Sequence, residues 1–230
     1  MNNPLKTITK KEWTLWIGSV GVILLSNILT GKVDFLMLVA ALVGVTSLVL
    51  AAKGNFWSQI LMIAFSILYA IISWQFRYWG EMITYLGMTL PMAVWSLITW
   101  RRNPSESGNE VAIQMLTRKQ MVVLLLTGGL LTALFYHILV SLSTPNILLS
   151  TISITTSFLA AALTMLRSSY YALGYAANDV VLIVLWVLAS IENPAYLPVV
   201  LNFVIFLLND LYGFRCWKKR EVCLEMAIDN

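Results

Sequence analysis

Charged residues are scarce in this sequence of 230 residues. Only 11% of the chain is Asp, Glu, Lys or Arg, and 59% is hydrophobic, whereas soluble domains carry about 25% charged residues. So little polar surface excludes a compact soluble enzyme. Intrinsic disorder is excluded as well, because it requires low hydrophobicity and high charge. The mean hydropathy of +0.80 instead predicts a protein embedded in a membrane.

Cysteine and catalytic motifs are equally scarce. Cys216 and Cys223 are too few for a disulfide scaffold. The sequence has no phosphate-binding G-x-x-x-x-G-K-[ST] loop, no H-E-x-x-H, no G-x-S-x-G and no Cys/His cluster. His137, the one histidine, stands alone and is typical of an interfacial or packing residue. We therefore expect neither an enzyme nor a bound cofactor or metal.

Long apolar runs fill most of the chain. A hydrocarbon core about 30 Å thick is crossed by roughly 20 helical residues, and eight segments meet this requirement. They are residues 13–31, 33–52, 56–76, 82–100, 120–142, 146–166, 170–191 and 195–214. Helices are favoured over a barrel, because the short alternating segments of barrel strands are absent. The sequence predicts an all-α integral membrane protein with eight transmembrane helices.

The positive charges predict the orientation of these spans. With the N-terminus in the cytoplasm, thirteen Lys and Arg residues fall on the inside and only Lys32 and Arg77 on the outside. This is a strong positive-inside bias, and it requires an even number of spans, so both termini are expected in the cytoplasm. The basic residues follow topology and form no stripe with exposed aromatics, so we expect the lipid bilayer and no nucleic acid as a partner.

An internal repeat appears when the sequence is compared with itself at an offset of 117 residues. Residues 100–102 then align with residues 217–219, Tyr69 with Trp186, and Trp79 with Tyr196. The offset places spans two to four on spans six to eight in the same orientation, which is a parallel repeat of the kind found in transporters. The alternative is that any two triplets of apolar helices align to some degree.

The repeat predicts a division of the chain into five parts. These are an N-terminal tail with an extra transmembrane helix (1–32), a first three-helix bundle (33–102), a cytoplasmic loop with a linker helix (103–145), a second three-helix bundle (146–219) and a cytoplasmic tail (220–230).

Polar residues inside the apolar spans are the candidates for function, since they are unfavourable in lipid. On span seven one stripe holds Tyr171, Tyr175, Asn178, Asp179, Leu182 and Trp186, and on span eight another holds Asn202, Phe206, Asn209, Asp210, Gly213 and Trp217. Span three adds Gln59, Ser66, Tyr69 and Ser73. Such faces can enclose a cavity for a small, flat and possibly cationic heteroaromatic compound with hydroxyls. Alternatively the amides only bridge helices, and Asp210 lies near enough to the cytoplasmic end to be half solvated.

Three stretches of the chain resemble the PnuC family of bacterial vitamin transporters. They are YWGEMITYLGMTLPMAVWSLITWRRNP (78–104), YLPVVLNFVIFLLNDLYGFRCWKKRE (196–221) and VTSLVLAAKG (45–54). The resemblance runs from about residue 33 to 221. It implies a fold similar to the sugar-transporting SWEET proteins, with two three-helix bundles joined by a linker helix, assembled as a homotrimer in the bacterial inner membrane. It also implies import of nicotinamide riboside by facilitated diffusion, with a cytoplasmic kinase that traps the product.

One motif departs from the family pattern. Family members commonly carry W-x-x-W-x-x-x-N, or a variant that ends in Asp, as part of the vitamin pocket. The matching positions here are Tyr171, Gly174 and Asn178, so the amide is present and both indoles are missing. Either Tyr171 and Tyr175 replace the stacking surface, or the substrate has changed to thiamine, riboflavin or another vitamin.

The sequence therefore predicts a vitamin uniporter with a pocket between the two bundles. We expect Tyr171, Tyr175 and Trp186 to stack on the substrate and Asp179 to compensate its charge. The expected hydrogen-bonding residues are Gln59, Asn178, Asn202 and Asn209. A membrane-embedded enzyme or assembly subunit, with Asp179 and Asp210 as acid and base, is disfavoured because the two acids are expected at different depths and no metal or nucleophile accompanies them.

Overall fold

A computed structural model describes residues 8–29, 34–106, 108, 110–144 and 146–228. Apart from one isolated antiparallel bridge between Pro104 and Val111, the regular structure of these residues is helical. In chain order the elements are α1 (Lys10–Leu29), α2 (Phe35–Ala52), α3 (Trp57–Gln75), α4 (Trp79–Thr84), the π-helix η2 (Tyr85–Thr89), α5 (Leu90–Arg102), α6 (Arg118–Ser141), α7 (Ile147–Met165), α8 (Tyr171–Glu192), the 3₁₀-helix η3 (Pro194–Tyr196) and α9 (Leu197–Ile228). The predicted all-α class is confirmed.

Seven helices among the described residues are long and apolar enough to cross a membrane. They are Phe35–Ala52, Trp57–Gln75, Trp79–Arg102, Arg118–Ser141, Ile147–Met165, Tyr171–Glu192 and Pro194–Ala227. Each coincides with a predicted span, with ends that differ by a few residues except that the last helix continues well beyond residue 214. The first predicted span coincides with α1, which is outside this set, so an eighth transmembrane helix stays a prediction.

The fourth span contains a wide turn that hydropathy did not predict. Residues 85–89 form a π-helix, and the Leu90 backbone N–H donates to the Tyr85 carbonyl, five residues earlier. Pro91 follows directly; it has no N–H, and its ring would clash with the carbonyl four residues before it. The π turn accommodates this proline without breaking the span. It also places Tyr85 in the interior of the protein, where it is 6% exposed.

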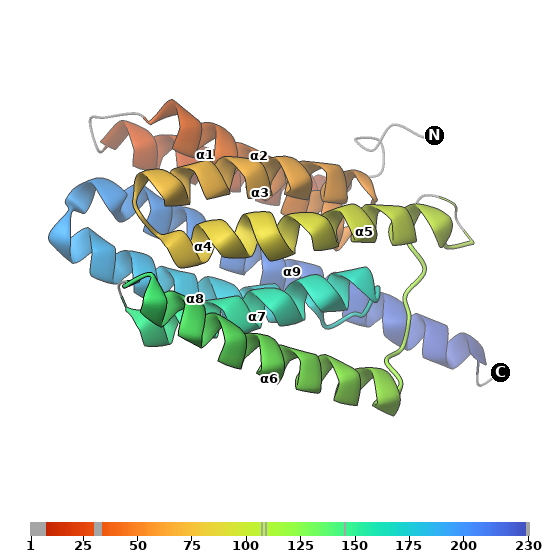
Figure 1. Cartoon of the computed structure of the whole chain (residues 1–230). Helices are drawn as coiled ribbons and strands as arrows, with labels where there is room; N and C mark the ends of the chain where they lie inside the picture. The colour runs from red at the N-terminus through yellow and green to blue at the C-terminus, as the bar shows by residue number, and fades with distance from the viewer. Residues whose placement is uncertain (1–7, 30–33, 107, 109, 145, 229–230) are drawn as a thin grey trace.

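The axes of the helices run roughly parallel to one another (Figure 1). Helix α2 packs on α3 and α9, while α8 packs on α7 and α9. The run from α4 to α5 lies beside α3 and also contacts α7. The beginning of α1 and the end of α9 lie at the same end of the bundle (Figure 1), which is the arrangement that an even number of crossings produces.

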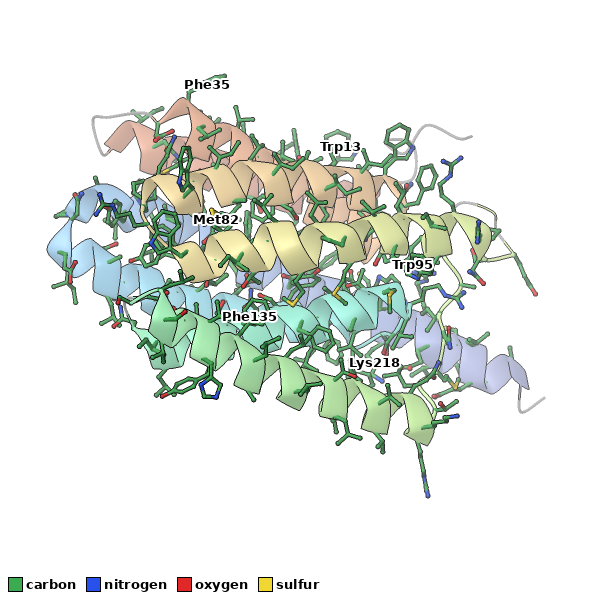
Figure 2. The ribbon with its side chains drawn as sticks, viewed as in Figure 1. Trp13, Phe35, Met82, Trp95, Phe135 and Lys218 are labelled. Carbon is green, nitrogen blue, oxygen red and sulfur yellow. The ribbon has the colours of Figure 1, made fainter. Side chains whose placement is uncertain are left out.

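Two peripheral helices complete the fold. Helix α6 lies on the outside of α7 and buries only Leu124, Gly128 and Leu139. The side chains on its outer flank are mostly carbon (Figure 2), as expected for a surface in contact with lipid. On the other side α1 packs on α2 and α9. There the buried Glu12 carboxylate pairs with Lys53, at 3.2 Å between Oε1 and Nζ, and accepts a hydrogen bond from the Tyr212 hydroxyl.

Candidate functional site

A small cavity of about 30 Å³ lies in the centre of the bundle, at the junction of α2, α3, η2, α8 and α9. Its lining consists of Gly44, Leu48, Met62, Phe65, Tyr85, Tyr175, Asn178, Asp179, Phe203, Phe206 and Asp210. A water molecule needs roughly 10–15 Å³ by this measure, so the cavity is about two waters in size. Three of the predicted site residues, Tyr175, Asn178 and Asp179, are thus brought together in the core.

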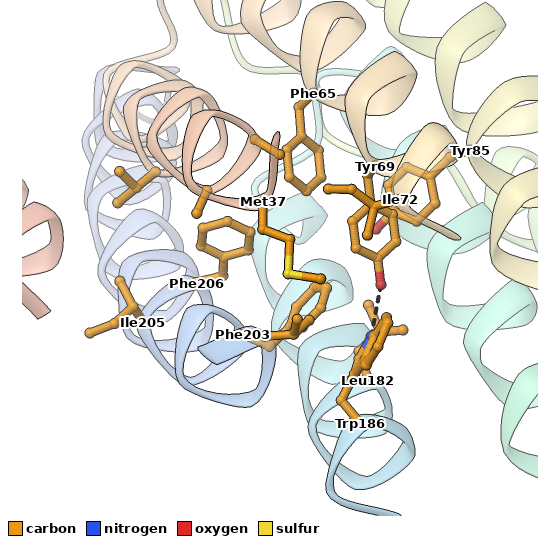
Figure 3. Packing of buried hydrophobic residues seen from close by; sticks show 14 of the residues in the cluster. Met37, Phe65, Tyr69, Ile72, Tyr85, Leu182, Trp186, Phe203, Ile205 and Phe206 are labelled. Atoms are coloured by element: carbon orange, nitrogen blue, oxygen red, sulfur yellow. Dashed lines mark hydrogen bonds between the residues drawn. The ribbon is translucent and has the colours of Figure 1, made fainter. Parts of the chain in front are cut away.

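Aromatic rings from both halves of the chain fill the space around this cavity. The Phe65 ring of α3 lies edge-to-face against Phe206 of α9, with ring centroids 5.7 Å apart, and against Tyr85, at 5.9 Å. Figure 3 shows these rings pointing toward one another from α3, η2 and α9. Gly44 on α2 makes this packing possible, because a Cβ there would lie 2.6 Å from Phe206 Cζ and 3.1 Å from the Phe65 ring.

The Asn178 carboxamide is fixed by hydroxyl groups of α7. Its Oδ1 accepts hydrogen bonds from Thr156 Oγ1 at 2.8 Å and Ser157 Oγ at 3.0 Å, and a longer one from Ser153 Oγ at 3.4 Å. The carbonyl end of the amide is therefore used inside the protein. The Nδ2 end is the donor that this side chain can offer to a ligand in the cavity.

Asp179 and Asp210 lie together at the cavity, one from α8 and one from α9. Both are buried, with 5% and 4% of their surface exposed. Two sequence-based expectations are thus wrong: Asp210 is not half solvated, and the two acids do not lie at different depths. The reason is that α8 and α9 are packed neighbours joined by a short connection, and Asp179 lies as far before the end of α8 as Asp210 lies after the start of α9.

A second cavity of about 20 Å³ adjoins the first and shares the walls formed by Phe65, Phe203 and Phe206. Asn202 lines it, and the Asn202 Oδ1 atom is buried without a hydrogen-bond partner. A buried carbonyl without a partner is unfavourable. It is therefore an acceptor available to a ligand.

Beyond this second cavity the interior is closed by an aromatic group that we call the outer closure: Tyr69, Phe76, Tyr78, Trp186 and Tyr196. The Trp186 indole N–H donates to the Tyr69 hydroxyl at 2.9 Å, as Figure 3 shows. Tyr78 and Phe76 pack edge-on against Trp186. Burial, with the nearby Tyr196 and Glu192, raises the pKa of Tyr78 to about 12, so its phenol is neutral at physiological pH. Trp186 is therefore a cover at one end of the site.

The opposite end is closed by a second group, the inner closure: Trp100, Tyr171 and Trp217. Trp100 and Trp217 contact each other with centroids 5.5 Å apart, and Tyr171 packs edge-on against Trp217 at 4.7 Å. The Trp100 indole donates to the Thr164 carbonyl of α7, and the Trp217 indole to the Ala51 carbonyl of α2, both at 2.9 Å. Tyr171 thus lies one helical turn away from the cavity-lining Tyr175.

The remaining two predicted site residues, Gln59 and Asn209, are hydrogen-bonded to other side chains of the protein. The Gln59 amide donates to Ser58 Oγ at 3.2 Å. The Asn209 amide donates to Ser19 Oγ of α1 at 3.0 Å and to the Ile205 carbonyl. Neither is among the residues that line the two central cavities.

The packing of Gly174 explains why no indole stands at this motif position. A Cβ on Gly174 would lie 2.9 Å from the Cα of Ala160 on α7. A tryptophan here would therefore run into the backbone of a neighbouring helix. Because α7 and α8 approach so closely, the stacking surface of the cavity comes from Tyr175 and from phenylalanines of α3 and α9 instead.

Several residues at the site carried no clear signal in the sequence. Phe65 and Phe203 are apolar residues in apolar helices, and nothing in the sequence distinguishes them from lipid-facing phenylalanines, whereas Phe206 lies on the polar stripe predicted for span eight. Glu81 is 1% exposed, and its carboxyl lies beside Ser153 of α7. Glu81 directly precedes the span predicted at 82–100, where charged residues are common. Its position one residue before an apolar run is the signal that could have identified it as a buried acid. Within the described residues no group of three or more His, Cys, Asp and Glu is placed to hold a metal.

Comparisons with known proteins agree with this architecture. Residues 34–219 match the family described as nicotinamide mononucleotide transporter. The chain is 27% identical over 192 residues to a nicotinamide riboside transporter PnuC of Neisseria mucosa, covering 81% of this chain and 73% of the relative. It is 27% identical over 188 residues to that of Haemophilus influenzae, covering 81% and 80%. The crystal structure of a vitamin B3 transporter PnuC has the same fold, with a TM-score of 0.81, 24% identity and 92% of both chains covered.

Proposed function

The chain belongs to the nicotinamide mononucleotide transporter family, and from this premise we propose that it carries nicotinamide riboside across the bacterial inner membrane. The observation that carries the proposal is the central cavity, where an acid pair, an anchored amide and five aromatic rings meet in the middle of the bundle. Nicotinamide riboside is a flat pyridinium with a carboxamide and a ribose. Its positive charge suits the acid pair, its carboxamide and hydroxyls suit the anchored amide, and its flat ring suits the aromatic rings.

Each group has a proposed role. The rings of Tyr175 and of the phenylalanines of α3 and α9 offer faces for stacking and for attraction of a cation. Asn178 Nδ2 donates to the carboxamide oxygen, and Asn202 Oδ1 accepts from the carboxamide or from a ribose hydroxyl. Asp179 compensates the positive charge. We propose that Tyr171 and Trp186 close the site at its two ends, and that Gln59 and Asn209 hold helices in place.

We propose that transport proceeds by alternating access between two repeat bundles, 33–102 and 146–219, arranged as in the SWEET proteins with residues 103–145 as loop and linker helix. Residues of the two closures support this reading. Tyr69 and Trp186 are 117 residues apart, as are Trp100 and Trp217, and each pair is in direct contact. The last helix of each half also donates an indole hydrogen bond to the first helix of the other half. Breaking one closure while the other holds opens the cavity to one side.

The remaining features of the proposal follow from the family resemblance and the charge count. They are eight spans with both termini in the cytoplasm, a homotrimer, and downhill uniport followed by phosphorylation of the product by a cytoplasmic kinase. A second candidate keeps the fold and exchanges the vitamin for thiamine or riboflavin. Positions 171 and 174 carry no indole, and for this reason the uptake experiment below includes thiamine and riboflavin.

The decisive experiment is uptake of labelled vitamins into liposomes that contain the purified protein and no kinase. We expect nicotinamide riboside to equilibrate without accumulating. Equilibration of thiamine or riboflavin in its place would overturn the proposed substrate. Accumulation driven by a pH gradient would overturn uniport.

A matched pair of variants tests the site itself. Asn178→Leu removes the anchored amide and is expected to abolish binding while the assembly stays intact. Asn209→Leu removes a buried amide that faces α1 and is expected to leave the affinity unchanged. Equal affinities in the two variants would remove Asn178 from the site.

A further inference from the structure

We propose that Asp179 and Asp210 together form one cation-binding site, in which two carboxyl groups share a single proton and present one negative charge to a positively charged ring in the central cavity. The inference rests on the proposed function and deepens it: it assigns Asp210 a part in substrate recognition and predicts that the transporter selects for the charge of its substrate.

The geometry of the pair supports a shared proton. The two side chains come from adjacent helices and both line the same cavity. Both are buried, with 5% and 4% of their surface exposed, and two ionised carboxylates that share one buried cavity repel each other, so one of the two holds a proton. Asp179 Oδ2 is buried and has no hydrogen-bond partner. The pair therefore has net charge −1 and an acceptor atom left over beside the cavity.

Side chains of the protein do not neutralise this charge. The ion pairs among the described residues are Lys53 with Glu12, Lys218 with Glu221, and Arg220 with Glu110, and none of them includes either aspartate. The titratable groups that interact with one or both acids include four phenols, Tyr175, Tyr85, Tyr69 and Tyr171, which carry no charge when protonated. A buried charge without a counter-charge is unfavourable, and a cationic ligand removes that penalty.

The walls of the cavity complete a site for a flat cation. Phe65, Tyr85, Phe203 and Phe206 surround the space opposite the acids, and aromatic faces attract cations electrostatically. One negative charge within an aromatic enclosure is the arrangement that recognises delocalised or quaternary nitrogen cations. The substrate class is therefore an N-substituted pyridinium or a comparable heteroaromatic cation, and neutral ring systems are discriminated against.

The test compares nicotinamide riboside with benzamide riboside, a neutral analogue in which carbon replaces the ring nitrogen. Affinities are measured by calorimetry on the purified full-length protein. We expect the wild type to bind the cation at least about tenfold more tightly than the neutral analogue. The neutral analogue leaves a buried negative charge without a partner, which is far more unfavourable than leaving an exposed charge unpaired. Equal affinities in the wild type would overturn the inference, whatever happens to the variants.

The variants identify the acids as the source of the preference. Asp179→Asn or Asp210→Asn alone leaves one carboxylate hydrogen-bonded to an amide, which imitates the shared proton, so each is expected to keep the preference within about threefold. The double variant carries no charge and is expected to bind both ligands equally. Asn178→Leu serves as the control, because it is expected to abolish the binding of both ligands alike. A double variant that folds, as judged by its elution profile, and still prefers the cation would overturn the inference.

Failure of the proposed function gives a different result. A wild type that binds thiamine and not nicotinamide riboside overturns the proposed substrate. The charge site is then supported if the double variant no longer binds thiamine, and it is overturned if the double variant still binds thiamine. A wild type that binds riboflavin alone, a neutral ring, overturns both.

Discussion

Gly44→Ala is the most direct perturbation of the central cavity, because it adds one methyl group at the point where two aromatic rings contact α2. The new Cβ would lie 2.6 Å from Phe206 Cζ and 3.1 Å from the Phe65 ring. Carbon atoms prefer separations of about 3.5–4.0 Å, so the end of the Phe206 ring must move by roughly 1 Å. The displacement is possible because Phe206 ends in the small cavity. It takes up space that the proposed ligand needs.

The magnitude follows from two opposing contributions. Overpacking of a core typically costs about 1–3 kcal/mol, while Gly→Ala in a helix interior gains about 0.5–1 kcal/mol. We therefore expect a decrease of about 1 kcal/mol in the free energy of unfolding. The affinity for substrate should fall by about tenfold, which corresponds to ~1.4 kcal/mol, because ligand entry must displace the same ring further.

The assay pairs calorimetric affinity with thermal unfolding of the purified protein. Gly129→Ala is the matched control: it makes the same change in a transmembrane helix at a place where a Cβ has nothing within 4 Å. The control should keep its affinity. If Gly44→Ala binds as tightly as the control, the rings at Gly44 do not limit access to the cavity, and the placement of the substrate there is refuted.

Three further substitutions test the closures and the helix contact beside the site. Tyr69→Phe leaves the buried Trp186 N–H without its acceptor, which should lower the free energy of unfolding by about 1–3 kcal/mol in thermal unfolding; an unchanged stability would mean that this hydrogen bond is not formed. Trp217→Phe breaks the hydrogen bond from the inner closure to α2 and should raise substrate exchange from the cytoplasmic side; unchanged exchange in oriented liposomes would contradict the role of this closure. Gly174→Ala forces a Cβ to within 2.9 Å of the Ala160 backbone and should destabilise by about 1–3 kcal/mol, and a variant as stable as wild type would show that α7 and α8 separate freely.

Hydropathy was sufficient to predict the helical class and the places where chain crosses the membrane. The span predicted at 33–52, for example, is α2 at Phe35–Ala52, because a segment rich in Leu, Val and Ala has no other way to satisfy its backbone in lipid. The polar stripe on α8 was likewise predicted to face inward. Tyr175, Asn178 and Asp179 do so, since amides and carboxylates are excluded from the lipid face.

The depth of each residue and its partner could not be predicted from one helix at a time. Tyr171 and Tyr175 share a stripe, yet one turn of helix places the first in the inner closure and the second at the cavity. Asp210 was misplaced because its distance from the basic residues of α9 does not reveal that it lies beside Asp179 of α8 at the same cavity. The depth and the partners of a residue depend on the axial offset between neighbouring helices, and the periodicity within one helix contains no information on that offset.

The two closures differ in the interactions that hold them, and this difference bears on which end of the cavity opens more readily. The outer closure has one hydrogen bond between its aromatic side chains, from Trp186 to Tyr69. At the inner end, two indole hydrogen bonds join the two halves of the chain. The connection between α5 and α6 contributes further interactions with α9. There Arg220 donates to the Val111 carbonyl at 2.6 Å and pairs with Glu110 at 3.2 Å. Opening the outer end therefore disrupts fewer hydrogen bonds and ion pairs than opening the inner end. With the orientation proposed above, we expect the substrate to enter from outside when the closure with fewer hydrogen bonds breaks, and the free energy of its binding at the central cavity to help open the other closure.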